Sequence, residues 1–181
     1  MIKGGKGGAN TKTGLVFELD TDLVSFLRKQ TGYTVGSIQG YKSSFLIIYN
    51  KKEVARTFPK NDLYSFLKKE HNLDWKTIFS KRLLPDDALY VIRNNTVYII
   101  EKKNQQGSGS VDEKLQTCNF KRKQYKKLFS RLNYEVEYVY LLSNWFKKPE
   151  YKDALDYIIS VNCQYYFEYI PLQKLGLPVP H

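Results

Sequence analysis

One segment constrains the fold of this chain more than any other. Residues 84–103 contain two short apolar runs separated by an Asn-Asn pair, and this pattern predicts a β-hairpin. Asp86 stands at the entrance of the first run, and Glu101 and Lys103 close the second. Side chains alternate between the faces of a strand, so Glu101 and Lys103 share a face, and the hairpin returns them toward Asp86.

Two carboxylates and an ammonium at one end of a β-ribbon favour a site for Mg²⁺ and a reactive water. Asp87 competes with Asp86 for the metal, but on an extended strand Asp87 points to the other face. Lys103 is expected to orient the water or to stabilise a pentacoordinate phosphate. As a general base it would first lose a proton, which the metal favours and the carboxylates oppose. Positioning and electrostatics are therefore the preferred role.

The charge of the chain agrees with a polyanionic partner. Twenty-nine Lys and Arg against eighteen Asp and Glu give a net charge of +11, which favours nucleic acid first and an anionic membrane second. No apolar stretch approaches the roughly 18 residues that a spanning helix needs, so we expect a cytoplasmic protein without a membrane segment. The chain has two cysteines, which lack the spacing of a zinc site, and we expect both to be reduced thiols. Its two histidines are His71 and His181, and this argues against a catalytic triad with a histidine base.

The remaining pattern predicts a basic flexible arm at residues 1–13 and a single domain at 14–181. From the hairpin onward the order is β-β-α-β-α-β, which suggests a parallel crossover on a mixed sheet. The predicted helices are 13–30, with a possible break at 20–21, 62–70 with Asn61 as its N-cap, 112–132 and 149–161, and the other predicted strands are 44–49, 53–58, 134–142 and 165–170.

Pro85-Asp86 followed by Glu101-x-Lys103 resembles the PD-(D/E)XK nuclease superfamily, whose best-known members are type II restriction endonucleases. Each short motif alone also fits a turn or a solvated strand edge, whereas the two together in strand context favour a catalytic site. The resemblance covers about residues 14–145 and implies an α/β fold (α+β mixed sheet): a restriction-endonuclease-like core with a central mixed β-sheet flanked by helices.

The resemblance also implies roles for individual residues. Asp86, Glu101 and the backbone carbonyl of Lys102 would bind Mg²⁺, with Mn²⁺ as a substitute. Glu18, in a segment similar to the first core helix of the family, would bind a second metal or its water shell. The helix after the hairpin is only loosely similar to a Gln-x-x-x-Tyr feature of some branches, since Gln116 and Gln124 are followed at that spacing by Phe120 and Leu128.

Contacts with DNA are expected from the helix after the hairpin and the loop before it. Basic side chains of the helix would follow phosphates, and polar side chains of the loop and helix start would read base edges. The first group is Lys121, Arg122, Lys123, Lys126 and Lys127, and the second is Asn104, Gln105, Gln106, Lys114 and Gln116.

These features together predict a Mg²⁺-dependent endodeoxyribonuclease that acts on double-stranded DNA. A type II restriction enzyme is the leading interpretation, with a two-fold homodimer on palindromic sites and a cognate DNA methyltransferase in the same cell. The alternatives are a repair, mismatch-nicking or junction-resolving nuclease with the same chemistry, and a module of this fold that binds DNA without cleaving it.

Overall fold

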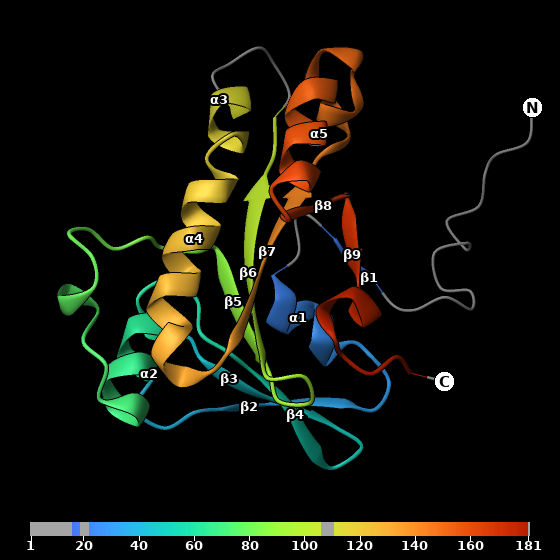
Figure 1. Cartoon of the computed structure of the whole chain (residues 1–181). Coiled ribbons are helices and arrows are strands. Elements are labelled where there is room, and N and C mark those ends of the chain that lie inside the picture. Colours follow the sequence, from blue (N-terminus) through green and yellow to red (C-terminus); the bar gives the residue numbers. More distant parts are fainter. Residues whose placement is uncertain (1–15, 19–21, 106–110, 181) are drawn as a thin grey trace, which may run out of the picture.

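The computed structural model describes residues 16–18, 22–105 and 111–180. Within them a seven-stranded mixed sheet forms the centre, and helices flank it (Figure 1). The predicted mixed α/β class is therefore confirmed. In spatial order the strands are β2 (Tyr33–Ser37), β3 (Phe45–Tyr49), β4 (Lys52–Thr57), β5 (Asp87–Val91), β6 (Thr96–Lys103), β7 (Glu135–Leu142) and β8 (Gln164–Phe167).

The connections between strands change character at β6. Strands β2 to β6 pair antiparallel, whereas β6, β7 and β8 pair parallel to one another. The chain crosses from β6 to β7 through α3 (Val111–Leu115) and α4 (Cys118–Phe129), and from β7 to β8 through α5 (Lys152–Ser160). The predicted parallel crossover is confirmed, since parallel strands require such a long connection.

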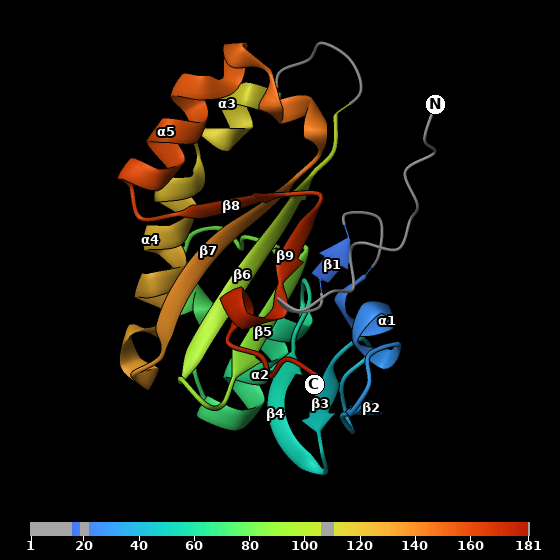
Figure 2. The same ribbon diagram turned by 90° about the vertical axis from the view of Figure 1, so that its right-hand side faces the viewer.

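Strand alternation divides the apolar side chains of the sheet into two cores. One face carries Ala88, Val97 and Ile99 under α2 (Asp62–His71), α4 and α5, with Tyr125 among the buried side chains. The other face carries Leu89 and Ile100 under α1 (Leu23–Arg28), β9 (Tyr169–Pro171) and the short helix η5 (Leu172–Leu175). Figure 2 shows these two layers on opposite sides of the sheet. Burial on both faces explains the nearly continuous apolar run of β6.

Both predicted hairpins form. Asn50 and Lys51, at the turn between β3 and β4, have φ angles of 47° and 67°, and the favoured two-residue hairpin turn requires positive φ at both central positions. At the second hairpin, Asn95 has a φ of 53° and its side-chain amide donates to the carbonyl of Asn133, 2.6 Å away. Asparagine tolerates this backbone region better than most residues, so Asn50 and Asn95 favour these turns, and the bond to Asn133 adds a long-range contact to the second.

The helix predicted at 13–30 is wrong in its first half. Val16–Glu18 forms strand β1, which pairs antiparallel with β9, and the helix is confined to Leu23–Arg28. The side chain of Asp22 accepts hydrogen bonds from the amides of Val24 and Ser25, which starts the helix at Leu23. A partner strand about 150 residues away is not visible in local periodicity.

Four further elements differ from the prediction. Strand β2 was not expected, and helix 112–132 is interrupted between α3 and α4 before a final 3₁₀ turn at Ser130–Leu132. Helix 149–161 begins as a 3₁₀ turn at Pro149–Tyr151, and the strand expected at 165–170 is split into β8 and β9 at Glu168, whose φ is 61°. The predicted basic arm at 1–13 lies outside the described residues.

Asn61 precedes α2 as predicted, but its side chain does not cap the helix. Its Oδ1 atom instead accepts a hydrogen bond from Nη1 of Arg82 at 2.8 Å. The predicted position of Asn61 at the N-cap is therefore confirmed, but the side-chain cap is absent, because Arg82 uses the oxygen that the helix amides would need.

Candidate active site

The register of the β5–β6 hairpin places the predicted acidic and basic residues. Asp87, the first residue of β5, pairs with Ile100, and Asp86 lies in the bend just before it, where its Oδ2 atom accepts a hydrogen bond from the backbone amide of Lys102. Asp86, Glu101 and Lys103 are therefore gathered at one end of the hairpin, where Glu101 and Lys103 share one face of β6, and Asp87 and Lys102 lie on the other face. We call the first three residues the carboxylate–lysine cluster.

Short polar contacts hold this cluster. Nζ of Lys103 lies 2.9 Å from Oε2 of Glu101 and 3.2 Å from the backbone carbonyl of Lys102. Oδ2 of Asp86 accepts a hydrogen bond from the amide of Lys102 at 2.9 Å. The N–H and C=O groups of a strand residue point to the same side, so the Lys102 carbonyl is directed toward Asp86.

A second lysine reaches the cluster from α4. Nζ of Lys121 lies 3.4 Å from Oε1 of Glu101, so each oxygen of this carboxylate has an ammonium neighbour. Glu101 is only 6 % exposed, and a buried carboxylate needs such compensation. Sequence reasoning had assigned Lys121 to phosphate contacts along the helix, and the structure brings it to the cluster.

Tyr125, one helical turn after Lys121, lies behind the cluster and was not identified from the sequence. Its side chain is fully buried, and its hydroxyl finds no hydrogen-bond partner among the described residues. Burial raises the pKa of Tyr125 far above its usual range, and the negative charges of Glu101 and Asp86 raise it further. The i,i+4 pair of α4 that faces the carboxylates is thus Lys121 and Tyr125, whereas Phe120 is exposed.

The opposite face carries a separate ion pair. Nζ of Lys102 lies 3.4 Å from Oδ2 of Asp87. Burial raises the pKa of Asp87, although the Lys102 ammonium opposes the shift. Partial burial would also raise the pKa of Asp22, but hydrogen bonds from Ser25 and Val24 outweigh it and lower that pKa below its usual value. Asp87 thus pairs with the Lys102 ammonium, whereas Asp86 accepts from the Lys102 amide, and both aspartates line one cavity.

The donor atoms of the cluster suit a hard divalent cation. Two carboxylates and a backbone carbonyl are oxygen ligands of the kind that Mg²⁺ takes together with water and substrate oxygens. No group of three His, Cys, Asp or Glu side chains able to hold a metal occurs in the described part of the chain. The oxygen atoms of the cluster are those of Asp86, Glu101 and the Lys102 carbonyl, and the ammonium groups of Lys103 and Lys121 lie beside the last two.

Glu18 ends strand β1, where its backbone pairs with Tyr169. Its side chain lies outside the described residues, and its role as a third acid stays a prediction. Strand β1 replaces the helix that the resemblance led us to expect around it.

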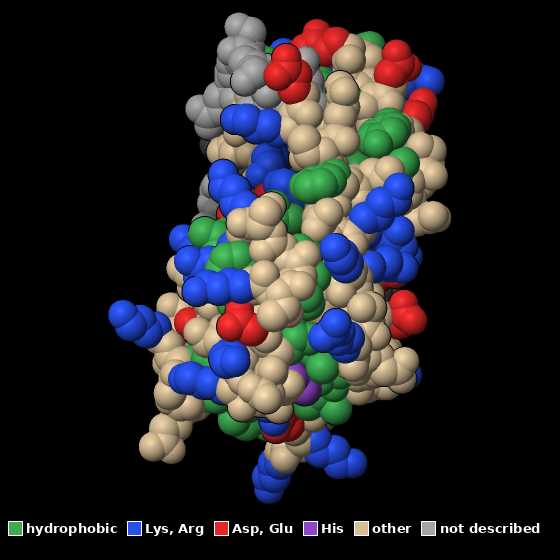
Figure 3. Space-filling view, turned by 60° about the vertical axis from the view of Figure 1, so that its left-hand side comes forward, with side chains coloured by type: hydrophobic (Ala, Val, Ile, Leu, Met, Phe, Trp, Pro, Cys, Tyr) green, Lys and Arg blue, Asp and Glu red, His purple; other side chains and the backbone are tan. Residues whose placement is uncertain are grey.

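The residues proposed to contact DNA are distributed unevenly over the surface. Asn104, Lys114 and Gln116 are exposed, as are Lys123, Lys126 and Lys127 on α4, whereas Arg122 is half-buried. Gln105 is buried, and its backbone amide donates a hydrogen bond to Oγ of Ser143 at 3.3 Å. Gln106 lies outside the described residues. Figure 3 shows lysine and arginine side chains spread over the side of the molecule that carries α4 and α2, while several acidic side chains gather at the top, where α3 and α5 lie.

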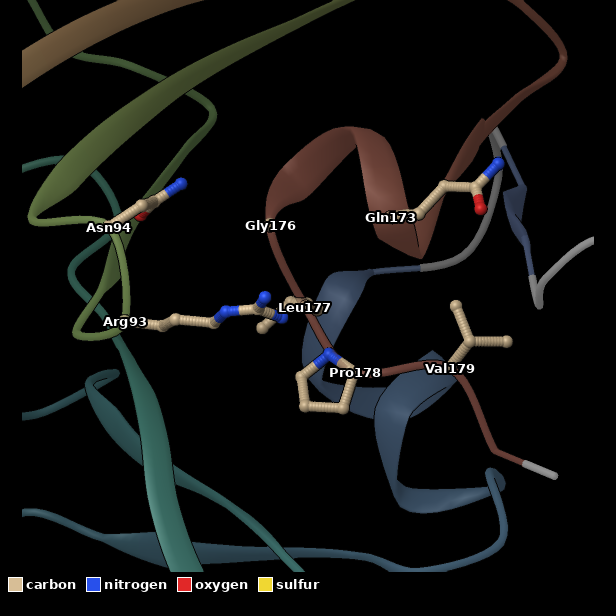
Figure 4. Close-up of a pocket in the computed structure, with 7 residues that line it drawn as sticks. All are labelled: Arg93, Asn94, Gln173, Gly176, Leu177, Pro178 and Val179. Carbon is tan, nitrogen blue, oxygen red and sulfur yellow. The ribbon is translucent and has the colours of Figure 1, made fainter.

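Cavities lined by described residues lie at different places on the molecule. One of about 430 Å³ opens beside the cluster and includes Asp86, Asp87, Asp22 and Asn61 in its wall. A second of about 320 Å³ lies next to the start of α2 and shares Asn61. A third of about 420 Å³ lies at the opposite end of β6, where the Arg93 side chain extends from the hairpin turn toward the C-terminal segment 176–179 (Figure 4). The lining of the third cavity contains no carboxylate.

Comparison of the chain with known protein families, with curated proteins and with solved structures found no match in any of the three. Among the described helices, none combines the length and the apolar character that crossing a membrane would require. The functional argument therefore depends on the geometry of the site.

Proposed function

We propose that this protein is a Mg²⁺-dependent endodeoxyribonuclease that hydrolyses phosphodiester bonds in double-stranded DNA. The observation that carries the proposal is the gathering of Asp86, Glu101 and Lys103 at one end of the β5–β6 hairpin, where Lys103 lies 2.9 Å from Glu101 and Asp86 accepts a hydrogen bond from the amide of Lys102. The fold agrees with it, since an antiparallel hairpin followed by a helix and a parallel strand is the order expected for a restriction-endonuclease-like core.

Bound Mg²⁺ would neutralise charge on the scissile phosphate and lower the pKa of a water molecule. Asp86 and Glu101 would hold it through carboxylate oxygens, and Lys102 through its backbone carbonyl. Hydrolysis forms a bond between a water oxygen and phosphorus and breaks a phosphorus–oxygen ester bond. The family resemblance implies a 5′-phosphate and a 3′-hydroxyl as the products.

Lys103 would act by position and charge. Its ammonium is held between Oε2 of Glu101 and the Lys102 carbonyl, where it can donate a hydrogen bond to the attacking water or to a phosphate oxygen. Lys121 would place a second positive charge on the other side of Glu101. Both groups stabilise charge that increases in the pentacoordinate transition state, which is the main contribution a protein makes to phosphoryl transfer.

The test is a cleavage assay on plasmid DNA with Mg²⁺. Glu101→Gln and Lys103→Met should lower the cleavage rate by at least about 10²- to 10³-fold while DNA binding persists. Asp87→Asn is the matched control, because it removes a carboxylate from the same hairpin but from the opposite face, and its rate should stay near that of the wild type. Equal loss in all three variants, or no cleavage by the wild type on any DNA, would contradict the proposal.

Two forms of this activity remain to be separated. The sequence motif favours the restriction form. In this form a two-fold homodimer cleaves at a short fixed site, and a methyltransferase of the host protects that site. A repair or junction-resolving form is favoured by the basic, aromatic cavity that shares Asn61 with the cavity at the cluster. Sequencing the ends produced from diverse linear and branched DNA distinguishes them, because a fixed sequence at the ends supports restriction and structure-dependent ends support the second form.

A further inference from the structure

The cavity beside the start of α2 has a strongly positive wall. Its volume is about 320 Å³, and four of its lining side chains are lysine or arginine against one aspartate. That aspartate, Asp74, is already engaged, since its Oδ1 atom accepts a hydrogen bond from the amide of Lys76 and its Oδ2 atom lies 3.9 Å from Nζ of Lys68. The lining residues are Asn61, Tyr64, Ser65, Lys68, Lys69, Asp74, Trp75, Lys76 and Arg82.

Arg82 is fixed in this wall without a counter-ion. Its guanidinium lies 5.1 Å from the ring centre of Trp75 and 5.9 Å from that of Tyr64, and Nη1 donates to Oδ1 of Asn61 at 2.8 Å. No carboxylate lies within 4.0 Å of it in the described part of the chain. A guanidinium carries five N–H donors in a fixed fork, so most of them remain for an anion such as a phosphate.

The aromatic rings give the cavity a second kind of contact. Trp75 is half-buried, whereas Tyr64 is buried, with its hydroxyl bonded to the carbonyl of Leu83, and packs edge-on against Trp75 at 5.9 Å between ring centres. Trp75 is therefore partly exposed in the wall of the cavity, between Tyr64 and the Arg82 guanidinium. A positively charged groove with an aromatic ring is the arrangement by which proteins bind single-stranded nucleic acid, because bases stack on the ring while cations follow the phosphates.

The cavity is also close to the carboxylate–lysine cluster. Asn61 lines both this cavity and the one that contains Asp86. Arg82 precedes Asp86 by four residues, so their Cα atoms are at most about 14 Å apart, which is roughly four nucleotides at the rise of one DNA strand. A strand that leaves Asp86 can reach Arg82 and Trp75 within a few nucleotides.

We propose that this cavity binds a single-stranded segment of the DNA substrate, with a base stacked on Trp75 and phosphates on Arg82, Lys68 and Lys76. The proposal deepens the proposed function and rests on it for its meaning: the substrate contains single-stranded DNA next to the cleavage site, as in a fork, flap or overhang. The binding itself is independent of cleavage.

Binding is measured first, without Mg²⁺, by titrating the protein with a thymidine oligonucleotide of about 12 nucleotides and following tryptophan fluorescence. We expect the oligonucleotide to quench the fluorescence of Trp75, and this quenching should be lost in Trp75→Phe. The dissociation constant should rise about 10- to 100-fold in Trp75→Ala and in Arg82→Ala. Arg82→Lys, which keeps the charge and loses the fork, should also bind more weakly than the wild type. Lys174→Ala, which removes an exposed charge elsewhere, should bind as the wild type does.

Circular dichroism checks that each variant is folded, and Arg82→Lys provides the decisive comparison if an alanine variant is not. Absence of quenching, equal quenching by thymidine monophosphate, or equal binding of a blunt duplex would each overturn the inference. Cleavage is then measured on forked and blunt duplexes with Mg²⁺, where Trp75→Ala should raise KM for the fork alone. Cleavage without single-strand binding leaves the proposed function standing and removes this inference. Single-strand binding without cleavage on any DNA leaves this inference standing and removes the proposed function.

Discussion

At the scale of single residues, the surroundings of Asp86 and Asp87 differ although the two are adjacent in the chain. Asp86 is exposed and accepts a hydrogen bond from the Lys102 amide, whereas the Asp87 side chain is largely buried beside the Lys102 ammonium. Burial raises the pKa of Asp87. Asp87 begins strand β5, so strand alternation turns its side chain to the face of Lys102, whereas Asp86 lies in the bend before the strand.

Lys121 provides the sharpest prediction at this scale. Lys121→Ala removes the ammonium 3.4 Å from Oε1 of Glu101 and should lower kcat about 10- to 100-fold with a smaller change in KM, because its charge acts on the transition state. Single-turnover cleavage measures the effect. Lys123→Ala removes an exposed charge two residues away and should change binding more than kcat. Equal effects of the two variants on kcat would show that Lys121 serves only as a phosphate contact.

At the scale of elements, α1 depends on one side chain for its first turn. Oδ1 of Asp22 accepts hydrogen bonds from the amides of Val24 and Ser25, both at 3.0 Å, and Leu23 and Leu27 are fully buried against the sheet. The helix has only six residues, which is too short to be stable in isolation, so the cap and the packing together maintain it.

Asp22→Ala should lower the free energy of unfolding by about 1 kcal/mol at neutral pH, and Asp22→Asn by much less, because asparagine also caps helices. The pKa of Asp22 is lowered in the folded state, so the stabilisation is present above its usual value of 3.8 and is lost as the pH falls through the folded value. Urea denaturation at several pH values measures this. The difference between wild type and Asp22→Ala should therefore shrink at acidic pH, and a difference independent of pH would contradict the assignment.

At the scale of the whole molecule, the chain has a net charge of +11, and one side of the molecule carries many of its basic side chains. The side with α4 and α2 carries many basic side chains, whereas several acidic ones gather over α3 and α5 (Figure 3). Binding to DNA through such a face releases counterions from the phosphates, so affinity falls as the salt concentration rises.

We expect the logarithm of the DNA association constant to fall linearly with the logarithm of the salt concentration. Lys126→Ala and Lys127→Ala, each removing one exposed cation of α4, should each reduce the slope by about one. Fluorescence anisotropy at several salt concentrations gives the slopes. Lys152→Ala, on α5 beside Asp156, is the control and should leave the slope unchanged. Equal slopes for all variants would place the DNA elsewhere on the molecule.

Local patterns in the sequence were sufficient for much of the fold. The hairpins, α2, β7 and the crossover were predicted because alternation, turn residues and helical periodicity act over a few residues. The break between α3 and α4 and the strand β2 were not predicted, since neither has a strong local signal. Strand β1 was predicted as helix, because its three residues become a strand only by pairing with β9.

By itself, the sequence determined which residues of the β5–β6 hairpin share a face, because strand alternation and turn position follow from neighbouring residues. It thereby predicted that Asp86, Glu101 and Lys103 form one cluster and that Asp87 belongs to the other face. Only the tertiary structure decided what approaches from elsewhere in the chain. Lys121 reaches Glu101, and Arg82 reaches Asn61 and Trp75, because helices and loops pack across the sheet at distances that no local pattern encodes.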